Sequence, residues 1–283
     1  MSTEKVWIIT GASRGFGYEI AKAALAKGDK VVATVRSKAI DLAARLGNNP
    51  NLLVTLLDVT NEQQAKTVAE EAIGKFGRID ILVNNAGFGI LSAVEEATDA
   101  EVRRNYDTNV FGLLNVCRAV LPYMRKVKSG HVVNLSSVGG LTGVPGWGLY
   151  GSTKFAVEGI TEAMAAELAP LGIFATTVEP GFFRTDFLDA SSLDRTSNII
   201  PDYAATVGNM RDFATQVNHK QPGSAVKLAQ AIVKLAHSQK PPVHLPLGKD
   251  TLKFFSEKMD RFNAEIKEWN EVITSTDHED ATA

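Results

Sequence analysis

The sequence predicts an α/β fold in which helices cover both faces of a parallel, doubly wound sheet. Short runs rich in Val, Ile and Leu alternate with amphipathic helical stretches over the first two-thirds of the 283 residues. The runs show no polar alternation, which is typical of strands buried on both faces. Gly28, Gly47, Gly77 and Gly172 stand where a helix would end and the chain would turn into the next strand. Repeated βα units with short connections imply right-handed crossovers.

The predicted elements follow in order along the chain. The expected strands are residues 6–10, 30–35, 52–57, 79–84, 131–135 and 173–178, with 241–247 as a last edge strand between prolines. The expected helices are residues 16–27, 40–46, 62–76, 101–126 and 149–168, followed by a helix that Ser224 would cap. We expect one domain over residues 1–273.

Residues 182–221 interrupt the alternation without a strong strand signal. The segment is far longer than an ordinary connection in a compact domain. It carries many large apolar side chains, among them Phe187, Tyr203, Met210 and Phe213, which a disordered linker would lack. We therefore expect a substrate-binding lid with short helices.

The C-terminal region predicts an amphipathic helix over residues 250–272. Its apolar residues recur at alternating steps of three and four, and they are Leu252, Phe255, Met259, Phe262, Ile266 and Trp269. We expect this stripe to pack against the core, with a partner subunit as the alternative. The polar tail, residues 274–283, is predicted to be disordered.

The composition excludes several classes of protein. A net charge of −2 gives no reason to expect a nucleic acid or a membrane as partner. The absence of a long apolar segment and of a signal-peptide core predicts a cytoplasmic protein. Cys117, the only cysteine, is expected to be a buried structural thiol. The five histidines are scattered without ligand spacing, so we expect isolated surface or loop histidines and no metal site.

A glycine-rich turn follows the first strand and opens into the first helix. Residues 10–17 read Thr-Gly-Ala-Ser-Arg-Gly-Phe-Gly, a spacing that allows a pyrophosphate to approach the backbone at a helix N-terminus. A site for unphosphorylated NAD usually places an acidic residue at the end of the second strand. This chain instead has Arg36 there and Arg14 in the turn. Two guanidinium groups would bind a 2′-phosphate, so we expect NADP(H).

Tyr150 and Lys154 are four positions apart and share one face of a predicted helix. A phenol is a weak acid, with an unperturbed pKa of about 10. A fixed positive charge beside it favours the phenolate and brings proton transfer closer to physiological pH. Because such a pair also occurs on ordinary helix surfaces, its meaning depends on the other motifs.

Several motifs in order resemble those of the short-chain dehydrogenase/reductases. They are the turn at residues 10–17, Asp58-Val59, Asn84-Asn85-Ala86-Gly87, Asn109, Ser137, Tyr150-x-x-x-Lys154 and Pro180-Gly181. The resemblance covers roughly residues 5 to 250. It implies a Rossmann-type sheet of seven parallel strands in the order 3-2-1-4-5-6-7, with the cofactor across the carboxyl ends of the strands.

The resemblance also implies roles for individual residues. The expected catalytic set is Asn109, Ser137, Tyr150 and Lys154, with Asn109 placing a water for proton relay. The expected cofactor-binding residues are Gly11, Ser13, Arg14, Gly15, Phe16, Gly17, Arg36, Asp58, Val59, Asn85, Ala86, Gly87, Tyr150, Lys154, Pro180, Gly181 and Thr185. The expected substrate pocket is Phe88, Val138, Val144, Trp147, Phe182, Phe183 and Leu188, each of which could equally close the core.

These expectations lead to a function and its alternatives. The first hypothesis is NADPH-dependent, reversible reduction of a small apolar ketone or aldehyde, with Tyr150 as proton donor. The second is a hydroxysteroid- or retinol-type dehydrogenase with the same site. The third, from another class, is a nonenzymatic NADP-binding sensor or scaffold. A homo-oligomer, dimer or tetramer, is possible.

Overall fold

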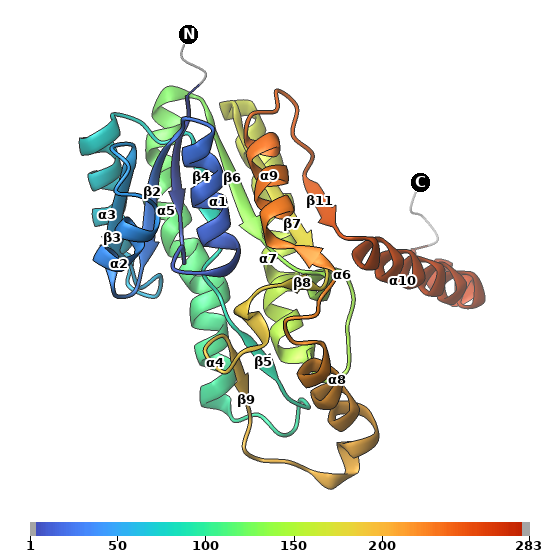
Figure 1. The fold of residues 1–283 in the computed structure, drawn as a ribbon. Coiled ribbons are helices and arrows are strands. Elements are labelled where there is room, and N and C mark those ends of the chain that lie inside the picture. The colour runs from blue at the N-terminus through green and yellow to red at the C-terminus, as the bar shows by residue number, and fades with distance from the viewer. Residues whose placement is uncertain (1–3, 279–283) are drawn as a thin grey trace.

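Seven parallel strands form the central sheet in the order β11-β7-β6-β4-β1-β2-β3 (Figure 1). The computed structural model describes residues 4–278. The strands are β1 (Val6–Ile9), β2 (Lys30–Val35), β3 (Leu52–Leu56), β4 (Ile81–Asn84), β6 (Gly130–Leu135), β7 (Ile173–Pro180) and β11 (His244–Leu247). This confirms the predicted fold class and strand order. The sheet winds outward in both directions from β1 and β4, and the crevice between their carboxyl ends is where such folds bind ligands.

Helices cover both faces of the sheet, and each face has its own hydrophobic core. One core packs α1 (Gly15–Ala26), α2 (Ala39–Arg45) and α9 (Ala225–Ala236) against the sheet. The other packs α3 (Glu62–Phe76), α5 (Leu113–Val127) and α7 (Gly148–Leu168). The strands read as continuous apolar runs because both of their faces are buried. Among the described residues, no helix has both the length and the apolar character that crossing a bilayer requires.

The helix expected over residues 101–126 is divided into three parts. α4 (Asp99–Tyr106) begins with a capping box between Thr98 and Glu101. A π-helical segment, Asp107–Gly112, then separates α4 from α5. Asn109 lies in this segment, so the expectation that it interrupts the helix is confirmed. Such π-bulges often occur at functional sites.

The lid, residues 182–221, contains the short helices that were expected and, in addition, short strands that the sequence pattern did not predict. β8 (Phe183–Arg184) pairs with β10 (Gly223–Ser224), and β9 (Leu193–Arg195) pairs with β5 (Gly89–Leu91). α8 (Asn209–Val217) completes the segment. The strands have only two or three residues each, too few for a period-two pattern to be recognised. These ladders attach the lid to Gly89–Leu91 and to Gly223–Ser224.

The expectation that the C-terminal stripe packs against the core is wrong. α10 (Lys249–Glu268) and α11 (Asn270–Thr274) extend away from the body, in red at the right of Figure 1. Every residue of the stripe has an exposed side chain. Of the tail expected to be disordered, residues 279–283 lie outside the described residues, and 275–278 continue from α11 in turns.

Candidate active site

A cavity of about 700 Å³ opens at the carboxyl ends of the strands. It is lined by residues from the glycine turn, from the ends of β2, β4, β6 and β7, from α7 and from the lid. The structure brings together at this cavity all seven expected pocket residues and all expected cofactor residues except Gly17. Of the expected catalytic set, Ser137, Tyr150 and Lys154 line it, whereas Asn109 lies behind the wall.

The glycine turn has the conformation that a bound pyrophosphate requires. Gly11 and Gly15 have φ values of +67° and +55°, which favour glycine. A Cβ atom on Gly17 would come within 2.5 Å of the Gly11 carbonyl oxygen. Gly17 therefore acts by allowing α1 to pack closely on the turn rather than by facing the cavity. The exposed turn and the N-terminus of α1 fit a dinucleotide.

Asn85 and Thr10 hold the glycine turn in place. The Asn85 side-chain amide donates hydrogen bonds to the carbonyls of Thr10, at 2.9 Å, and Gly11, at 3.1 Å. The Thr10 hydroxyl accepts from the backbone N–H groups of Asn85 and Ala86, both at 2.9 Å. The asparagine run thus has a structural role in addition to its position at the cavity.

The two arginines expected to bind a 2′-phosphate differ in their surroundings. Arg14 donates from Nη2 to the Ser191 carbonyl at 2.6 Å and to the Ser192 hydroxyl at 2.7 Å, so it connects the turn to the lid. Arg36 is exposed at the end of β2. Among residues 4–278 no group forms a hydrogen bond or ion pair with it. Arg36 is therefore the cation at this end of the cavity that is available to an anionic ligand.

Ser137 and Tyr150 lie beside each other at the opposite end of the cavity. Ser137 follows β6 and caps α6 (Val138–Leu141), accepting from the Gly139 N–H at 3.1 Å. Tyr150 lies in the first turn of α7. Burial raises the pKa of the Tyr150 phenol, and the hydrogen bond with Ser137 offsets only part of that rise. The phenol therefore keeps its proton at neutral pH.

Lys154 is buried one turn further along α7. Its ammonium donates to the Leu135 carbonyl at 2.7 Å and lies 5.7 Å from the centroid of the Tyr150 ring. Burial lowers the pKa of Lys154 to about 8, and the charge of Glu158 opposes this. The sequence led us to expect that Lys154 lowers the pKa of Tyr150. In this structure burial outweighs any such effect.

Asn109 supports the site from behind. Its side chain accepts from the Phe88 N–H at 3.1 Å and donates to the Phe88 carbonyl at 3.0 Å and the Thr153 hydroxyl at 3.1 Å. A Cβ on Gly87 would come within 2.9 Å of Asn109 Oδ1 and 3.9 Å of the Lys154 ammonium. The missing side chain of Gly87 therefore leaves open the space between these two polar groups. The expected water at Asn109 remains a prediction.

Ser136, which precedes Ser137 at the cavity, has its hydroxyl beside Glu158. Its buried hydroxyl has no hydrogen-bond partner of good geometry among the described residues. A Cβ on Gly140 would come within 2.5 Å of this hydroxyl and 3.1 Å of Glu158 Oε1, so Ser136 and Glu158 lie close together. The choice of Ser137 over Ser136 agrees with this geometry.

Aromatic rings surround Tyr150 and form the apolar end of the cavity. The Phe187 ring lies 5.4 Å from the Tyr150 ring and 6.3 Å from the Trp147 ring, between centroids. On the lid side, Phe182 contacts Phe213 at 5.7 Å. These contacts create an apolar surface around the only phenol in the cavity wall.

Some cavity residues were not identified from the sequence. They are Arg104, Asp186, Phe187, Asp194, Met210, Phe213, Gln221 and Phe254. Most of them belong to the lid, whose sequence has no motif from which cavity residues could be located. Arg104 and Asp194 form an ion pair at 2.5 Å across the cavity wall. The apolar residues of the lid were the available signal, since they were too numerous for a solvated loop.

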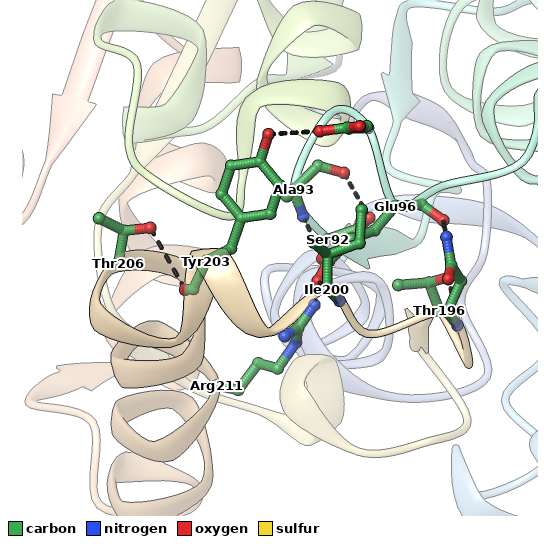
Figure 2. A network of polar contacts seen from close by, with 10 residues as sticks. Ser92, Ala93, Glu96, Thr196, Ile200, Tyr203, Thr206 and Arg211 are labelled. Carbon is green, nitrogen blue, oxygen red and sulfur yellow. Dashed lines mark hydrogen bonds and ion pairs between the residues drawn. The ribbon is translucent and has the colours of Figure 1, made fainter.

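A buried carboxylate, Glu96, anchors the lid (Figure 2). Glu96 accepts from the N–H groups of Ala93, at 2.8 Å, and Ile200, at 3.0 Å, and pairs with Arg211. Burial would raise the pKa of Glu96, but these hydrogen bonds and the guanidinium outweigh it and hold the pKa below its usual range. Glu96, a side chain of the body, thus holds both Ile200 and Arg211 of the lid.

A second buried group of carboxylates lies behind Lys154. Glu158 and Glu179 are almost fully buried, and His244 Nδ1 lies 3.5 Å from Glu158 Oε2 and 3.1 Å from Glu179 Oε1. Burial raises the pKa of both carboxyls, that of Glu179 to about 7. Glu179 is therefore partly protonated near neutral pH. One atom each from Glu158, Glu179 and His244 lie within 4.8 Å of one another, close enough to hold a cation.

The expectation of isolated surface histidines is accordingly wrong for four of them, since the exposed His219 also contacts Asp189 at 3.1 Å. His244 belongs to the cluster just described, and His237 bonds Asp29 at 2.8 Å. His131 is buried beside the Thr176 hydroxyl at 2.9 Å. Spacing along the chain did not reveal these contacts because each partner is distant in sequence.

Comparison with known proteins shows extensive similarity. The model of the short chain dehydrogenase family matches residues 5–196. The chain is 35% identical over 270 residues to oxidoreductase BOA17 of Botryotinia fuckeliana, covering 95% of this chain and 97% of the relative. It is 37% identical over 245 residues to the 3-ketodihydrosphingosine reductase of Bacteroides thetaiotaomicron, covering 86% and 88%.

Several solved structures also superpose on this chain. A short-chain dehydrogenase from Streptomyces avermitilis superposes with a TM-score of 0.89 at 40% identity, covering 98% of this chain and 100% of that one. ElxO with NADP bound superposes at 0.74 and 29% identity, covering 88% and 99%. The 3-ketoacyl-(acyl-carrier-protein) reductase of Brucella melitensis, complexed with NADH, superposes at 0.72 and 27% identity, covering 87% and 98%.

Proposed function

The chain belongs to the short-chain dehydrogenase family of oxidoreductases, and from this premise we propose that it reduces hydrophobic ketones or aldehydes to alcohols with NADPH, reversibly. One observation carries the proposal. Tyr150, Ser137 and Lys154 meet at the aromatic end of a cavity whose other end is the glycine turn. A carbonyl compound and a dinucleotide can thus share the cavity.

The residues divide the chemistry among them. A nicotinamide held in the cavity would supply hydride to the carbonyl carbon. Negative charge then grows on the carbonyl oxygen, and Tyr150 donates its phenolic proton to that oxygen while Ser137 stabilises it by a hydrogen bond. Lys154 stabilises the phenolate that remains, because its ammonium lies on the same helix face. Solvent returns the proton to Tyr150.

The protonation state of Tyr150 supports the reductive direction. Because burial raises the pKa of the phenol, the donor carries its proton at neutral pH. Oxidation of an alcohol would require the phenolate, whose formation burial disfavours. The same buried surroundings exclude water from the reacting carbonyl.

The cofactor preference rests on Arg36. It is an exposed cation at the end of β2, where a site for unphosphorylated NAD would carry an acidic residue. Its guanidinium can pair with a 2′-phosphate through two hydrogen bonds. Solved relatives hold either NADP or NADH, so the residue rather than the family supports NADPH.

The aromatic wall supports an apolar substrate. Trp147 and Phe187 flank the phenol. A second candidate, a long-chain 3-ketone, is favoured by the identity to a 3-ketodihydrosphingosine reductase. Steroid and retinoid substrates are the remaining candidates of the same reaction class.

An activity screen tests the function. Aryl ketones, long-chain 3-ketones, steroids and retinoids would be assayed by the absorbance of NADPH and NADH, with Tyr150→Phe as the matched variant. We expect NADPH-dependent turnover of at least one apolar class, reduced by roughly 10²- to 10⁴-fold in the variant, while NADPH binding by fluorescence is kept. Binding of NADPH without turnover above the variant across the whole panel would favour the sensor or scaffold.

A further inference from the structure

The apolar stripe of α10 is exposed along its whole length. We define the α10 stripe as Leu252, Phe255, Met259, Phe262 and Ile266 of α10 together with Trp269, the residue that caps its C-terminus. Their exposed fractions lie between 37% and 59%. Single exposed apolar residues are common, but a continuous row of this length marks an interaction surface. The projecting helix in Figure 1 carries it away from the rest of the chain.

The body of the protein already occupies a different side of α10. Thr251 donates to the Leu247 carbonyl at 2.9 Å, and the Phe254 ring lies 6.5 Å from the Phe182 ring. Lys258 donates to the Leu141 carbonyl at 2.7 Å and lies over the Phe155 ring at 4.9 Å. Residues 251, 254 and 258 form one side of the helix, and the α10 stripe lies beside it. The chain's own residues therefore fix the helix without covering the stripe.

The spacing of the α10 stripe is that of a coiled coil. Steps of three and four residues alternate from 252 to 269, which places Leu252, Met259 and Ile266 at a positions and Phe255, Phe262 and Trp269 at d positions. A strict seven-residue repeat keeps an apolar seam facing a second helix that runs alongside. The helix is also long enough, at 20 residues for α10 alone, to make such a contact.

The stripe complements itself when two copies run antiparallel. In antiparallel coils an a position faces a d position. One register places every a residue of the stripe opposite a d residue of the other copy: 252 with 269, 255 with 266, and 259 with 262. The three pairs belong to the same register because the two position numbers add to 521 in each of them. A two-fold axis between residues 260 and 261 generates each pair twice. No stripe residue is left without an apolar partner in this register.

The charges beside the seam favour the same arrangement. Lys258 and Glu265 occupy g positions, and in antiparallel coils g positions of the two helices flank the seam together. In the register above, Lys258 of each copy lies near Glu265 of the other, which gives two pairs of opposite charge. A parallel arrangement would set both residues against asparagines, Asn263 and Asn270. Lys258 can keep its bond to Leu141 because an ammonium has three donors.

We propose that a second copy of this chain packs along the α10 stripe as an antiparallel two-helix coiled coil. The interface is formed by the six residues of the α10 stripe with Lys258 and Glu265, none of which lines the cavity. Oligomerisation through it is therefore separable from catalysis.

The mass of the full-length protein in solution tests the interface. The double substitution Phe262→Glu with Ile266→Glu places charges in the seam, and we expect it to halve the mass measured by light scattering or sedimentation. Asp260→Lys with Arg261→Glu, on the outer side of the same helix, is the matched control and should leave the mass unchanged. Equal NADPH turnover and thermal unfolding of the two variants would show an intact body. A mass that the seam variant does not change would overturn the proposal.

Charge reversal tests the register. Glu265→Lys would replace both Lys258–Glu265 pairs of the dimer by pairs of like charge. We expect the dimer Kd to rise roughly 2- to 30-fold at low salt. Glu257→Lys, an exposed glutamate of α10 away from the seam, is the control. Equal effects of the two substitutions would contradict the register.

Cysteine cross-linking tests the direction. Cys117 does not interfere, since it is buried and burial raises its pKa to about 12. In the antiparallel pair, Met259→Cys alone forms no disulfide-linked dimer, whereas Met259→Cys with Phe262→Cys does. Efficient cross-linking by either single variant would show a parallel pair and overturn the proposed arrangement.

Discussion

Glu158 lies one turn beyond Lys154 on α7, and its charge opposes the fall in the pKa of Lys154 that burial causes. Both side chains are more than nine-tenths buried. Glu158 is itself faced by Glu179 and Ser136, by His244 from β11, and by Glu162 further along the helix. The catalytic ammonium thus depends on a carboxylate that does not reach the cavity.

The first prediction follows from that pair. Glu158→Gln removes the opposing charge and should lower the pKa of Lys154 further below about 8. Since Lys154 acts in its charged form, activity is lost as pH rises through its pKa. The alkaline limb of the kcat/KM profile should therefore move to lower pH, by roughly one unit.

Glu162→Gln is the matched control, because Glu162 is on the same helix with a mostly exposed side chain. Its profile should follow that of the wild type. An alkaline limb that stays in place in Glu158→Gln would mean that Glu158 does not set the charge of Lys154.

The second prediction concerns the cofactor. Arg36→Asp should weaken NADPH by roughly 10- to 100-fold, the loss expected for hydrogen bonds to a charged group, and NADH far less. Dissociation constants from fluorescence quenching would measure both. Lys38→Asp changes the same charge two residues away, outside the cavity wall, and should affect the two cofactors equally. Equal losses in Arg36→Asp would exclude phosphate recognition by this residue.

The third prediction concerns the anchor of the lid. Glu96→Gln leaves Arg211 without its ion pair and should lower the free energy of unfolding by about 3 kcal/mol, with faster proteolysis of residues 182–221. Glu95→Gln is the control, because Glu95 is exposed and accepts a hydrogen bond from the Tyr203 hydroxyl. Urea unfolding of both variants provides the comparison.

The pH dependence of that anchor has a definite sign. The pKa of Glu96 is lowered in the folded protein, so its stabilisation is present above the usual glutamate pKa and is lost as pH falls through the lowered value. The free energy of unfolding of Glu96→Gln should therefore differ less from that of the wild type in acid than at neutral pH. A difference that is independent of pH would contradict the ionised anchor.

The fourth prediction concerns Glu179, whose pKa is raised to about 7. The folded state holds the proton more tightly than the unfolded state, so stability falls as pH rises from about 4.5 through 7. Glu179→Gln keeps an acceptor for Thr177 but has no charge, and it should raise Tm by a few degrees at pH 8 and little at pH 5. Thermal unfolding at the two pH values would detect this, and an equal change at both would refute it.

The fifth prediction concerns the aromatic wall. Phe187→Ala removes the ring beside Tyr150 and should raise KM for bulky apolar ketones roughly tenfold, with a smaller effect on small ketones. Phe174→Ala, at an exposed position of β7 outside the cavity wall, serves as control. A uniform change in KM for all substrates would mean that Phe187 does not contact the substrate.

Much of the fold could be predicted because strands and helices leave periodic patterns in the chain. The apolar runs located every strand of the main sheet to within a few residues, and turn glycines such as Gly77 marked the helix ends. The motif residues could be placed at one cavity because carboxyl ends of parallel strands share one edge of the sheet. The short strands β5 and β9 could not be predicted, because three residues are too few to show a period-two pattern.

The contacts within the lid could not be read from the chain. Glu96 meets Arg211 and Ile200 across more than a hundred residues, and no local pattern records such a distance. The same holds for Glu158, Glu179 and His244, which come from α7, β7 and β11.

The sequence by itself determined the elements, the order of the motifs and which motif residues lie at the cavity, because periodicity and glycine conformation act locally. Only the tertiary structure decided the charge states of Tyr150 and Lys154, since burial depends on what surrounds a side chain. The α10 stripe shows the same division. Its spacing revealed an apolar face, but which surface covers a face depends on the packing of the whole molecule, and here the body leaves it exposed.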